Sequence, residues 1–148
     1  ELRNALAHRT APHILTPHPA EAARLLGVST AEVQHDRIAS ALAIAQQFDC
    51  GVVLKGAGSV CAWSDGRWAI NSSGNPGMAT AGMGDVLTGL LAALLARGVD
   101  VRIALEAGVY LHGAAADTLL IEARGPIGMT AGEVIDAARQ LVNLHTRI

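Results

Sequence analysis

Short aliphatic runs alternate with longer segments that carry helix caps along most of this 148-residue chain. The first aliphatic run, His13–Leu15, is stopped by prolines, and Pro19 suits the first turn of a helix that closes at Gly27. A second run, Val52–Lys55, has the composition of a buried strand. Because strands that alternate with helices fold into layers, the pattern predicts an α/β fold with a largely parallel sheet.

Capping and turn residues place the other elements. Ser29 is followed by Glu32 three residues later, a capping box that predicts one helix over 29–48. The sequence around Ser64-Asp65-Gly66 predicts a hairpin. Its strands are expected at Ser59–Trp63 and Trp68–Asn71. Residues 2–9 are expected to form the end of a helix, and further helices are expected at Val86–Ala96, 101–123 and 130–148.

Composition narrows the class of protein. The chain is 51% hydrophobic and 16% charged with a net charge of -2, which is typical of one soluble globular domain. It has no basic stripe for nucleic acid or a membrane surface, and no apolar run near the roughly 18 residues of a membrane span. Cys50 and Cys61 lie in apolar segments without metal-ligand spacing, so we expect two buried thiols in a reducing compartment. We therefore expect a cytoplasmic protein that binds neither nucleic acid nor membranes.

The glycine-rich stretch "GNPGMATAGMGD" precedes an aliphatic helix, and it suits an anion site. The N-terminus of a helix presents unpaired N–H groups and a partial positive charge. Gly82 and Gly84 leave space for a phosphate to reach those donors. The stretch matches neither a Walker A loop nor a Rossmann fingerprint. The alternative is that these glycines only form a turn.

Asp85 stands at the joint between the glycines and the helix. A carboxylate in the first turn stabilises a helix as a cap or as a partner of the helix dipole. Beside a bound phosphate, however, it would repel the ligand. A base that takes a proton from a hydroxyl attacking phosphorus explains a carboxylate there better.

Three segments, "ILTPHPAE", "VVLKGAGS" and "NPGMATAGMGDVLTG", resemble motifs of one enzyme family in the same order. The family is that of the ADP-dependent NAD(P)H-hydrate dehydratases, within the ribokinase superfamily, and the similarity covers essentially the whole chain. It implies a ribokinase-like three-layer α/β/α fold, of which residues 1–148 are the C-terminal portion of a single domain. It also implies a missing N-terminal half, a fused epimerase domain in many bacterial members, and a homotetramer.

The resemblance implies a lyase that repairs hydrated NADH and NADPH. In this family a carboxylate deprotonates the ring hydroxyl of the hydrate, and the hydroxyl attacks the terminal phosphoryl group of ADP. The ring nitrogen then helps to expel phosphate, so that the products are AMP, phosphate and the intact cofactor. Mg²⁺ is expected to accompany the nucleotide.

The resemblance also assigns roles to residues. Asp85 matches the base that contacts the substrate, and His18 matches a substrate-contacting histidine; Glu21 would order a magnesium-bound water, and no side chain is assigned as a metal ligand. The residues that match the nucleotide-binding set are Lys55, Gly56, Ala57, Gly58, Ser59, Gly82, Met83 and Gly84. Without the resemblance, Lys55 reads equally well as a surface lysine, and a lone histidine such as His18 is more often structural.

Some positions depart from the patterns of the superfamily. Its sugar and vitamin kinases have asparagine where this chain has His18, and this favours the dehydratase. Ala20 and Ala81 stand where family members commonly have glycine, and Ala81 adds a methyl group near the expected phosphate. Two alternatives stay open: a small-molecule kinase of the same superfamily, and a non-catalytic fragment that binds adenine nucleotide.

Overall fold

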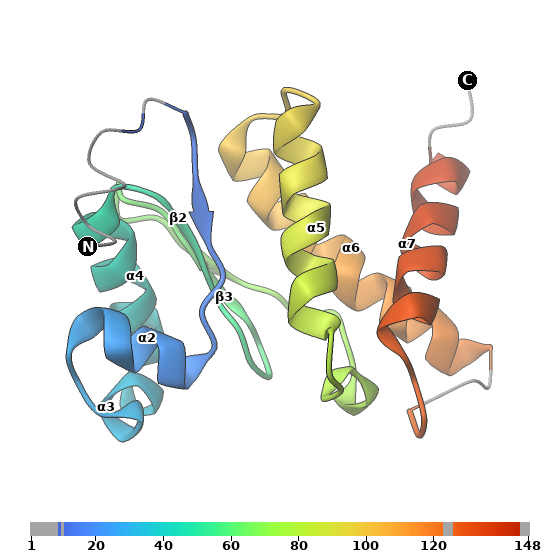
Figure 1. Ribbon diagram of the computed structural model, residues 1–148, viewed down its shortest axis with the longest axis horizontal. Helices are drawn as coiled ribbons and strands as arrows, with labels where there is room; N and C mark the ends of the chain where they lie inside the picture. The colour runs from blue at the N-terminus through green and yellow to red at the C-terminus, as the bar shows by residue number, and fades with distance from the viewer. Residues whose placement is uncertain (1–8, 10, 123–125, 146–148) are drawn as a thin grey trace.

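The computed structural model describes residue 9 and residues 11–122 and 126–145, so the expected helix end at 2–9 falls almost entirely outside the described residues. Three layers are visible in Figure 1: helices α2 to α4, a sheet, and helices α5 to α7. The elements are β1 (Ile14–Leu15), α2 (Pro19–Leu26), α3 (Thr30–His35), α4 (Arg37–Phe48), β2 (Gly51–Leu54), β3 (Val60–Ala62), β4 (Trp68–Ile70), the 3₁₀ helix η1 (Pro76–Met78), α5 (Met83–Ala96), α6 (Val101–Ile121) and α7 (Ala131–His145).

The described sheet has the strand order β1-β2-β3-β4. β1 pairs with β2 in parallel, whereas β3 pairs with both β2 and β4 in antiparallel fashion. The α/β class and the hairpin are confirmed. The sheet itself is mixed rather than largely parallel in the part described, because the hairpin contributes two of its three pairings.

Alternate residues of the strands face the two helical layers. Val52 and Leu54 of β2 pack into the core formed with α2 and α4, where Ile44 is completely buried. Val53, between them, faces the other way and packs against Leu87 of α5 and Leu105 of α6. Both faces of β2 are therefore covered, and all four of its residues are buried.

The segment from Ser29 to Phe48 forms two helices, so the prediction of a single helix is wrong. The chain leaves the helical conformation at Asp36, which has φ −140° and ψ 90°. The Asp36 side chain accepts a hydrogen bond from the N–H of Ala39 and so caps α4. The predicted capping box of Ser29 and Glu32 is confirmed at the start of α3.

Helix α2 matches the prediction closely. Pro19 occupies its first turn, and Gly27 ends it in the left-handed conformation with φ 72°. Helix α5 begins at Met83, three residues earlier than expected, so the last part of the glycine-rich stretch forms its first turn. The described parts of α6 and α7 follow the expected ranges.

The structure also bears on the two cysteines and on membrane insertion. Cys50 and Cys61 are buried free thiols, as predicted, and burial raises the pKa of each to about 12. Within the described residues, no helix combines the length and the apolar character needed to cross a membrane.

Candidate active site

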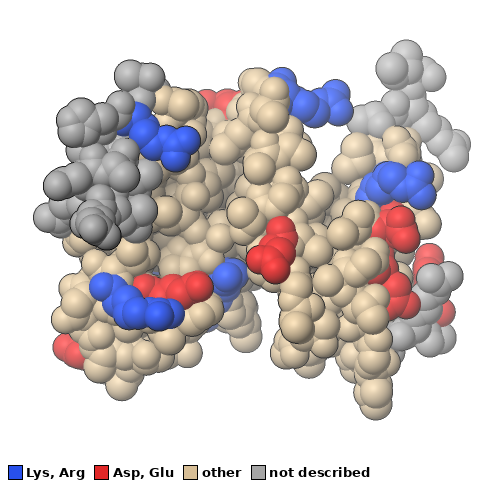
Figure 2. Space-filling view, in the orientation of Figure 1, with Lys and Arg blue, Asp and Glu red and all other residues tan. Residues whose placement is uncertain are grey.

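Three segments that are distant in the sequence meet at one end of the sheet. The N-terminus of α2, the residues after β2 and the first turn of α5 are joined there through Lys55, whose side chain lies against both the Glu21 carboxylate and the backbone of Gly84. Figure 2 shows the surface hollowed between the two helical layers, with acidic and basic side chains at the edges of the hollow. The fold therefore brings together sequence-predicted residues from all three motifs.

His18 caps helix α2. Its Nδ1 accepts hydrogen bonds from the N–H groups of Ala20 and Glu21, at 3.1 and 3.2 Å. Because Nδ1 is an acceptor in this arrangement, the ring proton resides on Nε2, which lies 3.5 Å from Oε1 of Glu21. The side chain of His18 is 47% exposed. His18 thus has a structural role, and substrate contact stays a prediction.

Glu21 links the histidine to the lysine. Its Oε2 accepts a hydrogen bond from the backbone N–H of His18 at 2.7 Å, and the same oxygen lies 3.8 Å from Nζ of Lys55. Burial alone would raise the pKa of the Glu21 carboxyl, but the His18 N–H and the charge of Lys55 together hold it below its ordinary value. Glu21 is therefore ionised at neutral pH and orients the lysine.

Lys55 points at the first turn of α5. Its side chain is 26% exposed, and its Nζ lies only 3.0 Å from the position that a Cβ on Gly84 would occupy. Lys55 is thus partly buried between two elements, and its binding of a nucleotide stays a prediction. Gly84 makes room for this ammonium group, whereas the sequence interpretation assigned the space to the ligand.

The first turn of α5 is uncapped within the described residues. Its N-cap, Gly82, has φ 86° and offers no side-chain hydrogen bond. The backbone N–H groups of Gly84 and Asp85 have no acceptor in the described part of the chain. Asp85 is exposed and makes no hydrogen bond or ion pair with any described residue. The carboxylate therefore does not cap the helix by a hydrogen bond, which removes the simplest structural explanation for it.

The loop Lys55–Ser59 is held in shape from within and from outside. The Ser59 hydroxyl donates to the Gly56 carbonyl at 3.1 Å, and Arg37 donates to the carbonyls of Ala57 and Leu54 at 2.6 and 3.1 Å. The N–H groups of Ala57 and Gly58 have no acceptor among the described residues, and both residues are exposed. Neighbouring N–H groups that are exposed and without an acceptor suit phosphate or ribose oxygens.

Sequence reasoning missed Arg37. Its guanidinium reaches the loop from the first residue of α4. The group leaves no space for a side chain at Gly56, where a Cβ would lie 2.7 Å from Nη2 of Arg37. Gly56 also has φ 151°. No local pattern marks Arg37, because its two partners are backbone carbonyls 17 and 20 residues away.

Within the described residues, no group of three or more His, Cys, Asp or Glu side chains is arranged to hold a metal ion. Glu21 at the N-terminus of α2 lies 3.8 Å from Lys55, and Asp85 supplies a second carboxylate in the first turn of α5. Such a site suits Mg²⁺ that arrives with a nucleotide, because Mg²⁺ keeps several waters and binds mainly to phosphate oxygens and one or two carboxylates.

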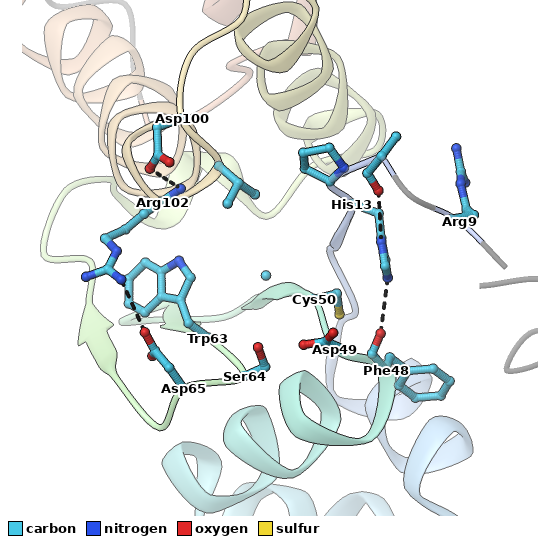
Figure 3. A pocket seen from close by; sticks show the side chains of 14 residues that line it. Arg9, His13, Phe48, Asp49, Cys50, Trp63, Ser64, Asp65, Asp100 and Arg102 are labelled. Atoms are coloured by element: carbon cyan, nitrogen blue, oxygen red, sulfur yellow. Dashed lines mark hydrogen bonds and ion pairs between the residues drawn. The ribbon is translucent and has the colours of Figure 1, made fainter. Parts of the chain in front are cut away.

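Two further hollows are present: one borders this site, and the other lies apart from it. One, of about 410 Å³, adjoins the Lys55–Ser59 loop and is lined by residues that include Arg37, Gly58 and Ile70. The other, of about 480 Å³, is lined by Cys50 and Gly51 at the opposite end of β2. Figure 3 shows Trp63 and Arg102 on one side of this second hollow and His13 on the other. No sequence-predicted site residue lines it.

Comparison with known proteins agrees with the motifs. A family model described as NAD(P)H-hydrate dehydratase matches residues 1–140. The chain belongs to this family. The ADP-dependent (S)-NAD(P)H-hydrate dehydratase of Neisseria meningitidis is 51% identical over 147 residues, which are 99% of this chain and 49% of that protein. The bifunctional NAD(P)H-hydrate repair enzyme of Escherichia coli is 45% identical over 88% of this chain and 25% of its own length.

Solved structures show the same relationship. The ADP/ATP-dependent NAD(P)H-hydrate dehydratase of Bacillus subtilis, co-crystallised with ATP and Mg²⁺ and soaked with CoA, has a TM-score of 0.86 and 37% identity. The match covers 92% of this chain and 50% of that one. A ribokinase-like superfamily protein of Enterococcus faecalis matches with a TM-score of 0.77 and 26% identity. The ribokinase-like fold is thus confirmed, and the chain spans half or less of the length of these relatives.

Proposed function

We propose that the protein containing this chain is an ADP-dependent dehydratase that returns hydrated NADH and NADPH to the intact cofactors. One observation carries the proposal: the uncapped first turn of α5 offers free N–H groups beside Nζ of Lys55, and an unpaired carboxylate, Asp85, stands in the same turn. Phosphoryl transfer needs this combination, namely donors for the phosphoryl oxygens and a base for the attacking hydroxyl.

In the proposed reaction the Lys55–Ser59 loop and the first turn of α5 hold ADP. The free N–H groups of Ala57, Gly58 and Gly84 donate to phosphate or ribose oxygens, and Lys55 offsets the negative charge. Bound Mg²⁺ would neutralise further charge on the phosphates. In this proposal the half-exposed side chain of His18 contacts the hydrated cofactor.

Asp85 accepts the proton of the ring hydroxyl as that oxygen forms a bond to the terminal phosphorus of ADP and AMP leaves. The lone pair of the ring nitrogen then expels phosphate from the ring, and loss of a ring proton restores the double bond. Phosphate is a better leaving group than hydroxide, which is why the nucleotide is consumed. The relatives that carry the dehydratase name support this chemistry.

As part of the same proposal, residues 1–148 are the C-terminal portion of a single domain whose upstream half completes the substrate pocket. Bacterial relatives with the bifunctional name match this chain over a quarter of their length, which supports a fused epimerase domain in proteins of that kind. A homotetramer in the cytoplasm follows from the resemblance alone.

The test uses the full-length protein. It is given ADP with hydrated NADH, and separately ATP with small alcohols such as a hydroxymethyl-pyrimidine. We expect absorbance at the NADH band to recover only in the first mixture, with AMP and phosphate released in equal amounts. Phosphorylation of the alcohol would instead establish the kinase, and binding of AMP without either reaction would indicate a nucleotide-binding module.

A further inference from the structure

The segment that leads into the candidate site lies against helix α6. Ser73 Oγ is 3.0 Å from the carbonyl oxygen of Tyr110, one turn before Gly113. A Cβ on Gly113 would lie 2.6 Å from the carbonyl carbon of Ser73 and 2.8 Å from the nitrogen of Gly74. Only glycine at position 113 therefore permits so close an approach of the segment to the helix.

One turn further along α6, the carboxylate of Asp117 forms hydrogen bonds with the segment. Its Oδ2 accepts a hydrogen bond from the N–H of Gly74 at 2.8 Å, and its Oδ1 accepts one from Nδ2 of Asn75 at 3.0 Å. Asn75 in turn accepts the N–H of Gly77 at 3.0 Å through its Oδ1 and so caps η1. Each polar atom of the two side chains has a partner, and Asp117 is only partly exposed.

The other end of the glycine-rich stretch is fixed to the same helix. Met83, the first residue of α5, is 4% exposed and packs with Ala115 and Ala116 of α6. Met78, at the end of η1, packs in the same cluster. Between these anchors run the residues that set the direction of the first turn of α5. Helix α6 thus contacts the glycine-rich stretch on both sides of the residues that lead into the first turn of α5.

We propose that Asp117 is a positioning residue for the first turn of α5. Through Gly74 and Asn75 it holds the glycine-rich segment in the conformation in which Gly84, at the first turn of α5, lies against Lys55. This inference rests on the proposed function for its effect on turnover. Its effect on the order of the segment does not depend on which reaction the protein catalyses.

The hydrogen-bond pattern specifies a sharp experiment. Asp117→Asn leaves one acceptor and adds one donor, so an amide NH₂ would face the NH₂ of Asn75. Asn75→Asp would instead place two carboxylates against each other. Combining Asn75→Asp with Asp117→Asn restores every bond with the roles exchanged: the new amide accepts from Gly74 and donates to the carboxylate at position 75, which also accepts from Gly77. Net charge is the same as in the original protein.

In the full-length protein we expect each single variant to lower kcat/KM for ADP with hydrated NADH by about 10- to 100-fold, since small misplacement of catalytic groups has effects of that size. Amide hydrogen exchange over residues 74–85 is expected to accelerate about 10-fold or more, as for the loss of one net hydrogen bond to a charged group. The double variant is expected to recover both properties to within about 3-fold, if the pair is restored. Asp136→Asn, an exposed carboxylate on α7, is the control.

The readouts separate the possible failures. If the single variants unfold at a lower temperature but keep kcat/KM and exchange rates well below that temperature, Asp117 only stabilises the fold and the inference is wrong. A double variant no better than the singles overturns it as well, and so do singles that match the original protein. If the original protein shows no turnover, the proposed function fails, and hydrogen exchange together with AMP affinity still decides the role of Asp117.

Discussion

Nζ of Lys55 lies 3.0 Å from the position that a Cβ on Gly84 would occupy, so the ammonium group is seated against bare backbone at the start of α5. The pair joins the end of β2 to the first turn of α5, and Glu21 holds the lysine from the other side at 3.8 Å. A positive charge thereby adjoins N–H groups that have no partner in the described part of the chain. Several of the expected properties of the protein depend on this contact.

Replacing Gly84 with alanine should displace Lys55 and weaken the binding of ADP about 10-fold, the loss of a charge-assisted contact. Gly84→Val should weaken it further. Isothermal titration calorimetry on the full-length protein measures both. Gly89→Ala is a matched control on the same helix, because a Cβ there meets nothing within 4 Å. That control should bind normally and gain about 0.5–1 kcal/mol of stability. Equal affinity in all three variants would remove the first turn of α5 from the nucleotide site.

Asp85→Asn keeps the shape of the side chain and loses the proton acceptor. We expect kcat to fall by about 10²–10⁴, the usual contribution of a positioned general base. ADP binding should persist or become tighter, because a negative charge near the phosphates is gone. Recovery of NADH absorbance gives the rate, calorimetry gives the affinity, and Asp136→Asn serves as control. Near-normal turnover would leave the proposed mechanism without its base.

Arg37→Met should loosen the Lys55–Ser59 loop. The variant removes two hydrogen bonds to the carbonyls of Leu54 and Ala57 while keeping much of the apolar stem of the side chain. Affinity for AMP should fall about 10-fold. Hydrogen bonds to charged groups are worth about 1.5–3 kcal/mol each, and part of the free energy lost with them lowers the stability of the loop conformation that binds AMP. Arg24→Met, on the exposed side of α2, is the control. If both variants bind AMP equally, Arg37 does not shape the nucleotide site.

His112 should make the stability of the protein depend on pH. The residue is 7% exposed, its Nε2 is buried without a partner in the described residues, and burial lowers its pKa below the ordinary value of 6.5, although a hydrogen bond with the Met83 backbone partly opposes this. The native state therefore favours neutral His112, and protonation favours the unfolded state. Its contribution is complete above about pH 6.5 and is lost as the pH falls from there toward the lowered native pKa.

The measurement compares the original protein with His112→Gln by urea unfolding at a series of pH values. Titration of the carboxyl groups is common to both proteins and cancels in the difference between their free energies of unfolding. That difference should shrink as the pH falls through the window below 6.5. A difference that stays constant, or one that grows on acidification, would contradict the prediction.

Much of the local structure could be predicted, because its causes lie within a few residues of one another. Pro19 and Gly27 mark the two ends of α2, and the capping box of Ser29 and Glu32 begins α3. The break at Asp36 was missed even though its signal is local. The Asp36 side chain caps the new helix α4 through the N–H of Ala39, but the apolar pattern of the sequence continues across the break. The early start of α5 was missed because glycines in a first turn look like a loop.

The sequence alone determined which chemical groups are available: two glycine-rich turns, a lysine after a strand, and a carboxylate at the start of a helix, in an order that matches one family. Only the tertiary structure decided what those groups do to one another. Gly84 serves the approach of Lys55, Arg37 fixes the loop that follows β2, and Asp117 holds Gly74 and Asn75. Most of these contacts join segments far apart in the chain through backbone atoms, whose chemistry is the same at every residue, and the bond between Asp117 and Asn75 joins two side chains that are 42 positions apart. A pattern of side chains therefore cannot specify them, whereas the packing of α5 and α6 against the sheet does.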